Sequence, residues 1–234
     1  MQKQTITLEV NNTNDMTAYV VWPDEKNSYP AILVFQEAFG VNDHIKNVTE
    51  KISAEGYIAI APELFHRTAK PGTTISYTNF DAVKPHMSAL TIDGLIEDIK
   101  ATHNWLQQQQ QVIKNKIGAV GFCLGGRVAF LANAVLPLAA AVSYYAGSVH
   151  TISDKAKDMH GPQVFFWGGL DKHILPEHRN TIIKALDDAG KEYINTVISY
   201  ADHGFNCDER TSYNPKAAKE AWAMTLAFFK NNLV

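Results

Sequence analysis

Cysteine is scarce in this chain, and long apolar runs and basic clusters are lacking. Only Cys123 and Cys207 occur among 234 residues, which excludes a disulfide scaffold and an all-cysteine structural zinc site. The longest apolar stretch, residues 128–142, is interrupted by Asn133 and Pro137, and a membrane span needs about 20 apolar residues. The N-terminus lacks the apolar segment of a signal peptide. We therefore expect a cytoplasmic protein with reduced thiols and no membrane partner.

The charge is nearly balanced, with 24 acidic and 21 basic side chains and a net charge of −3. A chain without a basic surface is not expected to bind nucleic acid. An apolar content of 46% and a charged content of 19% are typical of a folded globular protein. No linker, repeat or change of composition divides the sequence. We expect one domain over residues 1–234, as a monomer or small homo-oligomer.

Strand-like and helix-like segments alternate along the chain. Strands are expected at residues 5–10, 16–22, 31–35, 57–61, 117–122, 139–145, 163–167 and 193–200. The first two flank a turn-rich cluster, residues 11–15, and predict an antiparallel hairpin; the other six are apolar throughout, as in parallel strands buried on both faces. Helices are expected at residues 43–55, 88–111, 124–134, 176–189 and 215–231. The pattern predicts an α/β fold, with a doubly wound, mostly parallel sheet of about eight strands flanked by helices.

The sequence Gly121-Phe-Cys123-Leu-Gly125 connects a predicted buried strand directly to a predicted helix. This spacing is that of a nucleophile elbow, with cysteine where serine is commoner. The positive end of the helix dipole would stabilise a Cys123 thiolate, and the Leu124 N–H would be an oxyanion-hole donor. Two alternative interpretations of this segment remain. Cys123 could be a buried, inert thiol, or the glycines could form a dinucleotide-binding loop. A dinucleotide-binding loop requires an acid at the end of the next strand, and that strand ends in two tyrosines.

Asp171 and His203 follow two later predicted strands, in the order nucleophile, acid, histidine that the elbow fold requires. Carboxyl ends of parallel strands meet at one edge of the sheet, where ligands bind. Taken singly, Asp171 could be a turn acid. His203 could be a surface-loop histidine, since the chain has nine histidines. Asp171, His173 and His178 lack any recognised zinc spacing, so no metal is expected.

Seven blocks of the sequence, in this order, resemble the dienelactone hydrolase family of α/β-hydrolases: residues 36–42, 56–57, 61–64, 121–126, 143–147, 168–171 and 203–205. The resemblance implies that Cys123 is the nucleophile, Asp171 the orienting acid and His203 the general base. It also implies that Glu37 contacts the resting nucleophile and helps to activate it when substrate binds.

The same resemblance implies further roles and an activity. The backbone N–H groups of Ala38 and Leu124 match the oxyanion-hole positions, and Gln36 and Tyr144 match the pocket wall. The implied enzyme is a carboxylic ester hydrolase of the carboxymethylenebutenolidase type. It would cleave a small-molecule lactone or ester through a thioester acyl-enzyme, without metal or organic cofactor.

The basic residues depart from the family pattern. Family members grip a substrate carboxylate with two arginines, one of them just beyond the histidine, near where this chain has Cys207. Lys84 and Arg210 are the substrate-binding candidates, and Arg67 is also available. Two alternatives remain open: a general carboxylesterase or thioesterase on the same fold, and a hydrolase-like protein that binds a ligand without turnover.

Overall fold

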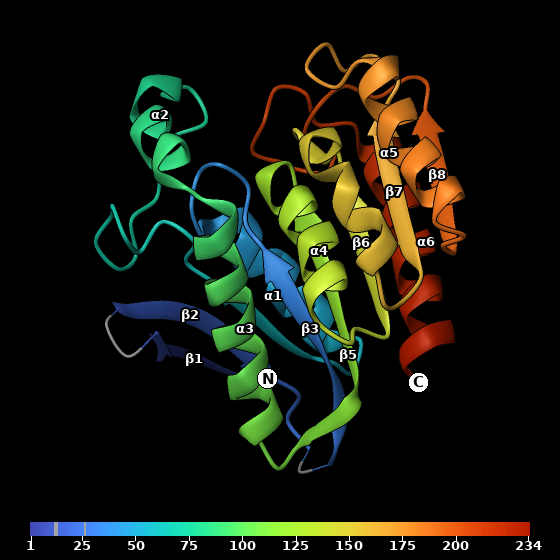
Figure 1. Cartoon of the computed structure of the whole chain (residues 1–234). Coiled ribbons are helices and arrows are strands. Elements are labelled where there is room, and N and C mark those ends of the chain that lie inside the picture. Colours follow the sequence, from blue (N-terminus) through green and yellow to red (C-terminus); the bar gives the residue numbers. More distant parts are fainter. Residues whose placement is uncertain (12–13, 26) are drawn as a thin grey trace. The chain divides into compact units, whose positions relative to one another are not determined.

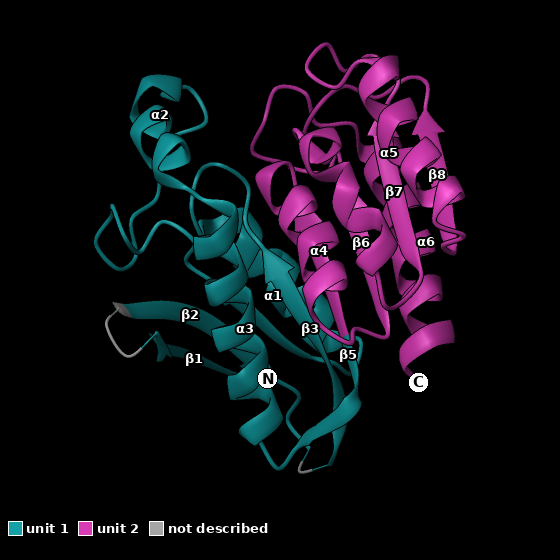
Figure 2. Cartoon of the chain, in the orientation of Figure 1, with its two compact units in different colours: residues 1–117 teal, residues 118–234 magenta. Residues whose placement is uncertain are grey.

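The computed structural model describes residues 1–11, 14–25 and 27–234, and these residues divide into two compact units, Met1–Ile117 and Gly118–Val234 (Figure 2). Over the described residues the chain has eight strands in a mostly parallel sheet with flanking helices (Figure 1). The predicted fold class is therefore confirmed. The single-domain assignment stays a prediction, and residues 12–13 of the predicted turn lie outside the described residues.

The first unit begins with an antiparallel hairpin and continues with parallel strands. Its strands are β1 (Gln2–Val10), β2 (Asn14–Trp22), β3 (Tyr29–Phe35) and β4 (Ile58–Pro62), in the spatial order β1-β2-β4-β3. β2 is antiparallel to both β1 and β4, whereas β3 and β4 are parallel. Strand β4 is buried at every position and β3 at all but the first. This burial explains why their sequences are apolar throughout rather than alternating.

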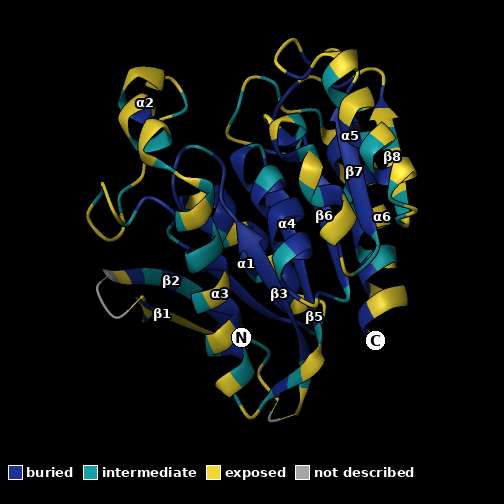
Figure 3. Ribbon diagram, in the orientation of Figure 1, coloured by how far each residue is buried: buried dark blue, intermediate teal, exposed yellow. Residues whose placement is uncertain are grey.

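The second unit contains the end of β5 (Val112–Phe122) and three further strands, β6 (Ala140–Tyr144), β7 (Gln163–Gly168) and β8 (Tyr193–Ile198). They lie in the order β5-β6-β7-β8 and are all parallel. β6 and β7 are completely buried (Figure 3). The prediction that the last strand is buried on both faces is wrong. Ile194 and Val197 are 45% and 48% exposed because β8 is the last strand in the order.

Four helices match the predicted ranges to within two residues: α1 (Asp43–Ala54), α4 (Leu124–Val135), α5 (Pro176–Asp188) and α6 (Pro215–Leu233). Gly56 and Gly190, just past α1 and α5, have φ angles of +89° and +61°. Glycine adopts this left-handed conformation without a steric cost, and it ends a helix cleanly. None of the helices among the described residues combines the length and the apolar character needed to cross a bilayer.

The predicted helix over residues 88–111 corresponds to α3 (Ile92–Gln108), whereas α2 (Phe80–Ala89), which lies almost entirely before that range, was not predicted. Leu90 and Thr91 are extended between them, and the Thr91 side chain accepts a hydrogen bond from the Gly94 N–H at 3.0 Å. The N-cap therefore starts a new helix where the apolar pattern alone is continuous. A 3₁₀ segment, η1 (Val149–Asp158), was not predicted either.

Candidate active site

Cys123 lies at the turn between β5 and α4, with an unusual backbone conformation of φ 55° and ψ −112°. A positive φ is strained for a residue with a side chain and persists only where the surroundings enforce it. Here the Cys123 N–H donates to the Tyr144 carbonyl at 3.0 Å, and the Cys123 carbonyl accepts from Gly126 at 3.0 Å and Gly147 at 3.1 Å. These hydrogen bonds hold a partly exposed thiol at the start of a helix.

The glycines beside Cys123 are required by close backbone contact. A Cβ atom added to Gly121 would lie 1.8 Å from the Gly125 carbonyl oxygen, and one added to Gly126 would lie 2.7 Å from the Tyr144 oxygen. Both neighbours are backbone atoms that cannot turn aside. The glycines therefore occupy the positions at which α4 comes close to β5 and to the end of β6 within the second unit.

Asp171 lies in the loop that follows β7 and is held by three hydrogen bonds. Its Oδ1 accepts from the His173 and Ile174 backbone N–H groups at 2.7 and 3.1 Å, and its Oδ2 lies 2.8 Å from His203 Nδ1. Burial opposes ionisation, but the hydrogen bond and charge of His203 and the two N–H groups outweigh it, so the pKa of Asp171 is below its ordinary value. The carboxylate is thus kept charged and fixed.

His203, in the loop after β8, links Asp171 to Cys123. Its Nδ1 bonds to Asp171, which leaves Nε2 for the hydrogen bond that the ring makes with Cys123. Burial opposes the charged ring, yet the negative charge of Cys123 and the hydrogen bonds that the ring makes to Asp171 and Cys123 raise the pKa of His203 to about 10. Asp171, His203 and Cys123 therefore form one hydrogen-bonded series, all within the second unit.

Three other predicted residues belong to the same unit. Leu124 is the first residue of α4, where N–H groups have no partner inside a helix. Tyr144 is fully buried, and its hydroxyl hydrogen-bonds Thr225 at 2.7 Å, so its side chain offers no surface to a ligand. The Arg210 guanidinium lies against Gly204, because a Cβ there would be 2.4 Å from an Arg210 nitrogen. This contact puts a cation beside the residue that follows His203.

The remaining predicted residues belong to the first unit. Gln36 is fully buried between the Glu37 carbonyl and the Leu64 N–H, so its side chain is not exposed as a pocket wall would be. Glu37 is 1% exposed and follows β3, and Ala38 lies in the adjoining turn. Lys84 lies in α2 and pairs with Asp81 at 2.6 Å, with both side chains largely exposed.

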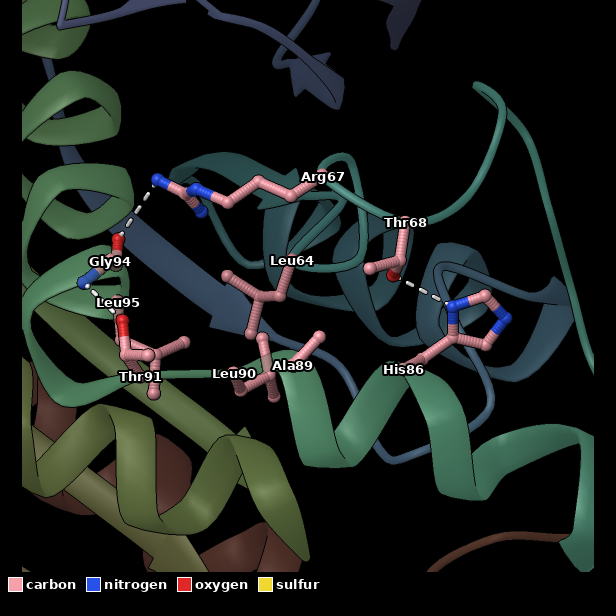
Figure 4. Close-up of a pocket in the computed structure, with 9 residues that line it drawn as sticks. All are labelled: Leu64, Arg67, Thr68, His86, Ala89, Leu90, Thr91, Gly94 and Leu95. Carbon is pink, nitrogen blue, oxygen red and sulfur yellow. Dashed lines mark hydrogen bonds between the residues drawn. The ribbon is translucent and has the colours of Figure 1, made fainter.

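Arg67, the other basic residue considered from the sequence, has a structural role. It binds Asp98, which is completely buried in α3, at 2.9 Å, and Glu97 at 3.2 Å. The small pocket beside it lies between the segment after β4 and the α2–α3 junction (Figure 4). There His86 contacts the Thr68 hydroxyl at 2.8 Å, and Arg67 reaches the Gly94 carbonyl at 3.4 Å. These contacts tie the segment after β4 to both helices.

Two residues near Cys123 and His203 were not predicted as part of an active site. The exposed His173 ring packs edge-on against His203, with ring centres 5.5 Å apart, although its sequence position suggested only a metal ligand. Arg127 lies in the first turn of α4, and its backbone N–H donates to the Cys123 carbonyl at 3.4 Å. The one local signal for Arg127 is a cation at the positive end of a helix, where acids are normally favoured.

Comparison with known proteins gives a consistent result. The family model described as "Dienelactone hydrolase family" matches residues 16–233. Two proteins named "Putative carboxymethylenebutenolidase" are each 33% identical: one from Synechocystis sp., covering 99% of this chain and 98% of that protein, and one from Yersinia pestis, covering 92% and 84%. The crystal structure of a "Putative Dienelactone Hydrolase" from Klebsiella pneumoniae has a TM-score of 0.87 at 28% identity, covering 98% of this chain and 99% of that one.

We predict that Gly121→Ala will destabilise the chain severely, because its Cβ would meet the Gly125 carbonyl oxygen at 1.8 Å. Overpacking of this kind costs about 1–3 kcal/mol or more. Gly147→Ala is the matched control, since its Cβ would lie 3.9 Å from the nearest atoms, which are those of Cys123. Thermal unfolding of both variants measures the difference. Equal melting temperatures for the two would contradict the close approach of β5 and α4.

The raised pKa of His203 predicts a pH-dependent contribution to stability. A raised folded-state pKa stabilises the fold fully below the unfolded value, near 6.5, and the contribution disappears as pH rises toward about 10. The free energy of unfolding of wild type should therefore exceed that of His203→Gln by a few kcal/mol at pH 6, and this difference should shrink steadily to pH 10. Denaturant unfolding across this range measures it, with His173→Gln as the neighbouring control. A gap that does not change with pH would argue against the charged pair.

Proposed function

The chain belongs to the dienelactone hydrolase family, and we propose that this hydrolase cleaves a small-molecule lactone or ester through Cys123, His203 and Asp171. One observation carries the proposal: a continuous hydrogen-bonded series runs from Asp171 through His203 to Cys123, which lies on a strained strand–helix turn. Nucleophile, base and orienting acid in hydrogen-bond contact form the arrangement that acyl transfer requires.

In the first half of the reaction, the Cys123 thiolate attacks the carbonyl carbon and forms a tetrahedral oxyanion. The oxyanion collapses, the bond to the leaving oxygen breaks, and the His203 imidazolium gives its proton to that oxygen. A thioester and a neutral His203 remain. With an enol-lactone the leaving oxygen is an enolate of the same molecule, so the ring opens and the product stays attached as the acyl group.

In the second half, neutral His203 takes a proton from water, and the resulting hydroxide attacks the thioester. The second tetrahedral oxyanion expels the Cys123 thiolate and releases the carboxylic acid, which restores the thiolate–imidazolium pair. Asp171 keeps Nδ1 protonated throughout, so Nε2 always faces the reacting atoms. No metal or organic cofactor takes part in this sequence.

Charge that develops on the substrate oxygen needs hydrogen-bond donors. The Leu124 N–H is suited to this, since it is the first N–H of α4 and the helix dipole adds to its positive field. The family resemblance assigns the second donor to the Ala38 N–H, and it assigns Glu37 to the activation of Cys123. Both assignments rest on the resemblance.

For the substrate, we propose an ester or lactone that carries a carboxylate bound by Arg210. The guanidinium next to Gly204 supports this, because it puts a permanent positive charge one residue from His203. Arg210 stands three residues beyond Cys207, near whose position the family pattern places an arginine. Lys84, whose side chain is largely exposed in α2, is the second candidate.

We predict that Cys123→Ala will lower the turnover of an activated aryl ester by about 10³-fold or more, and that Asp171→Asn will lower it by about 10²–10⁴-fold. Turnover is measured from release of the phenol. With wild-type protein, rapid quenching followed by intact mass measurement should detect the acyl adduct. Cys207→Ala, which replaces a thiol outside the series, is the control. Full turnover by Cys123→Ala would exclude this mechanism, and a wild-type chain without turnover on any lactone or ester would favour the non-catalytic alternative.

We also predict that Arg210→Ala will raise the KM for an anionic enol-lactone about tenfold or more and leave the KM for a neutral aryl ester almost unchanged. The reason is that a charge-assisted hydrogen bond to a carboxylate is lost only with the anionic substrate. Lys84→Ala is the matched control and should change neither KM. A general carboxylesterase would instead show no preference for the anionic substrate in the wild type, and Arg210→Ala would then have no selective effect.

A further inference from the structure

We propose that Gln36 is a positioning residue for the oxyanion hole: its buried side chain fixes the peptide group that carries the Ala38 N–H. Gln36 directly follows β3 and is completely buried. The inference rests on the proposed function, in which the Ala38 N–H is the second donor to the substrate oxygen. It gives Gln36 a role that requires no contact with the substrate.

The Gln36 carboxamide connects two backbone groups of the first unit. Its Oε1 accepts from the Leu64 N–H at 3.1 Å, and its Nε2 donates to the Glu37 carbonyl oxygen at 3.2 Å. The orientation of the amide is determined, because a backbone N–H can only donate and a carbonyl oxygen can only accept. A reversed amide would place donor against donor and acceptor against acceptor, and both buried backbone groups would lose their partner.

The Glu37 carbonyl and the Ala38 N–H belong to the same peptide group. This peptide bond is trans, and peptide groups are planar, so the carbonyl and the N–H point in opposite directions. A hydrogen bond that fixes the direction of the carbonyl therefore fixes the direction of the N–H as well. Gln36 thus acts on the proposed donor through one rigid unit.

The other end of the Gln36 amide is anchored at the neighbouring strand. β3 and β4 are parallel, with Leu33 opposite Ile60, and Leu64 lies two residues beyond the end of β4. Leu64 is 1% exposed and Gln36 is fully buried, so water does not compete for the hydrogen bond between them. The carboxyl ends of two paired strands are therefore joined where the turn after β3 begins.

A second contact holds the same turn further along the chain. The Ile75 N–H donates to the Phe39 carbonyl at 3.0 Å, and a Cβ added to Gly40 would lie 2.5 Å from the Thr73 carbonyl oxygen. The peptide group before Ala38 and the one after Phe39 are thus each held by a hydrogen bond. Gln36 fixes the end of the turn that carries the proposed donor.

The test compares two reactions of the Cys123 sulfur in the full chain. Acylation by an activated aryl ester passes through a tetrahedral oxyanion, whereas alkylation by iodoacetamide displaces iodide directly and forms no oxyanion. Both rates depend on the thiolate population in the same way, so their ratio reports the stabilisation of the oxyanion. Both are measured by acid quenching and mass spectrometry of the Cys123 peptide.

We expect Gln36→Met, which has neither the donor nor the acceptor of the amide, to lower the acylation rate about tenfold or more and to leave alkylation within about twofold of wild type. Removal of an oxyanion-hole donor typically costs about 10²–10³-fold, and here the Ala38 N–H is misdirected rather than removed. An acylation-to-alkylation ratio equal to that of wild type, or equal slowing of both reactions, would overturn the proposal.

Gln163→Met is the matched control. Gln163 is also completely buried and also uses both ends of its amide, accepting from Asn133 at 3.1 Å and donating to Ser143 at 2.9 Å. It is the first residue of β7, whereas Asp171 follows the other end of that strand. The ratio of the two rates in Gln163→Met should equal that of wild type, which separates the effect at Ala38 from loss of a buried amide.

If Gln36→Met does not fold by circular dichroism, Gln36→Glu takes its place. A protonated carboxyl group can still donate to the Glu37 carbonyl, and an ionised one cannot. The acylation-to-alkylation ratio of Gln36→Glu, relative to wild type, should therefore fall as the pH is raised from about 5 to about 9. A ratio equal to that of wild type throughout this range would overturn the proposal.

The same assay separates this inference from the proposed function. A wild-type chain that is alkylated at Cys123 but is never acylated there by the ester would reject Cys123 as the nucleophile, and the role of Gln36 with it. An acyl adduct that forms equally fast in wild type and in Gln36→Met would retain the nucleophile and reject only the role of Gln36.

Discussion

The backbone conformation of Cys123 is the constraint on which the rest of the site depends. A positive φ at a residue with a side chain costs about 1–3 kcal/mol, and the chain meets this cost with hydrogen bonds to Tyr144, Gly126 and Gly147. These bonds come from α4 and from the end of β6, so the helix start, the neighbouring strand end and the sulfur position are determined together. The close contacts at Gly121 and Gly126 follow from the same requirement.

Charge is arranged around this turn in alternating sign. Asp171 faces His203, and His203 faces Cys123. Asp171 and His203 are largely removed from water, and an isolated buried charge would be strongly unfavourable. Pairing makes the burial of these two groups tolerable, since it lowers the pKa of Asp171 and raises the pKa of His203.

Much of the fold and of the candidate site could be predicted from local sequence, and the predictions that were wrong have physical causes. Apolar runs located the strands, and glycine or proline located several helix ends, because both signals act within a few residues. The break at Thr91 was missed since a side-chain cap interrupts a continuous apolar pattern. The exposure of β8 was missed because a strand's place in the order is set by distant pairing. The order Cys123, Asp171, His203 was readable from strand ends. The roles of Glu37 and Ala38 came from the resemblance alone.

Under the proposed function, the contact between Gly204 and Arg210 links reactivity to selectivity. Gly204 has a φ of +78°, and the Arg210 guanidinium occupies the space where any side chain would begin. A substitution at Gly204 would therefore disturb the backbone that carries His203 and displace the arginine at the same time. If Arg210 binds substrate as proposed, a new ligand preference is most accessible through replacement of Arg210 itself, since that change leaves the loop backbone intact. Substrate choice could then change while the proposed chemical step is kept.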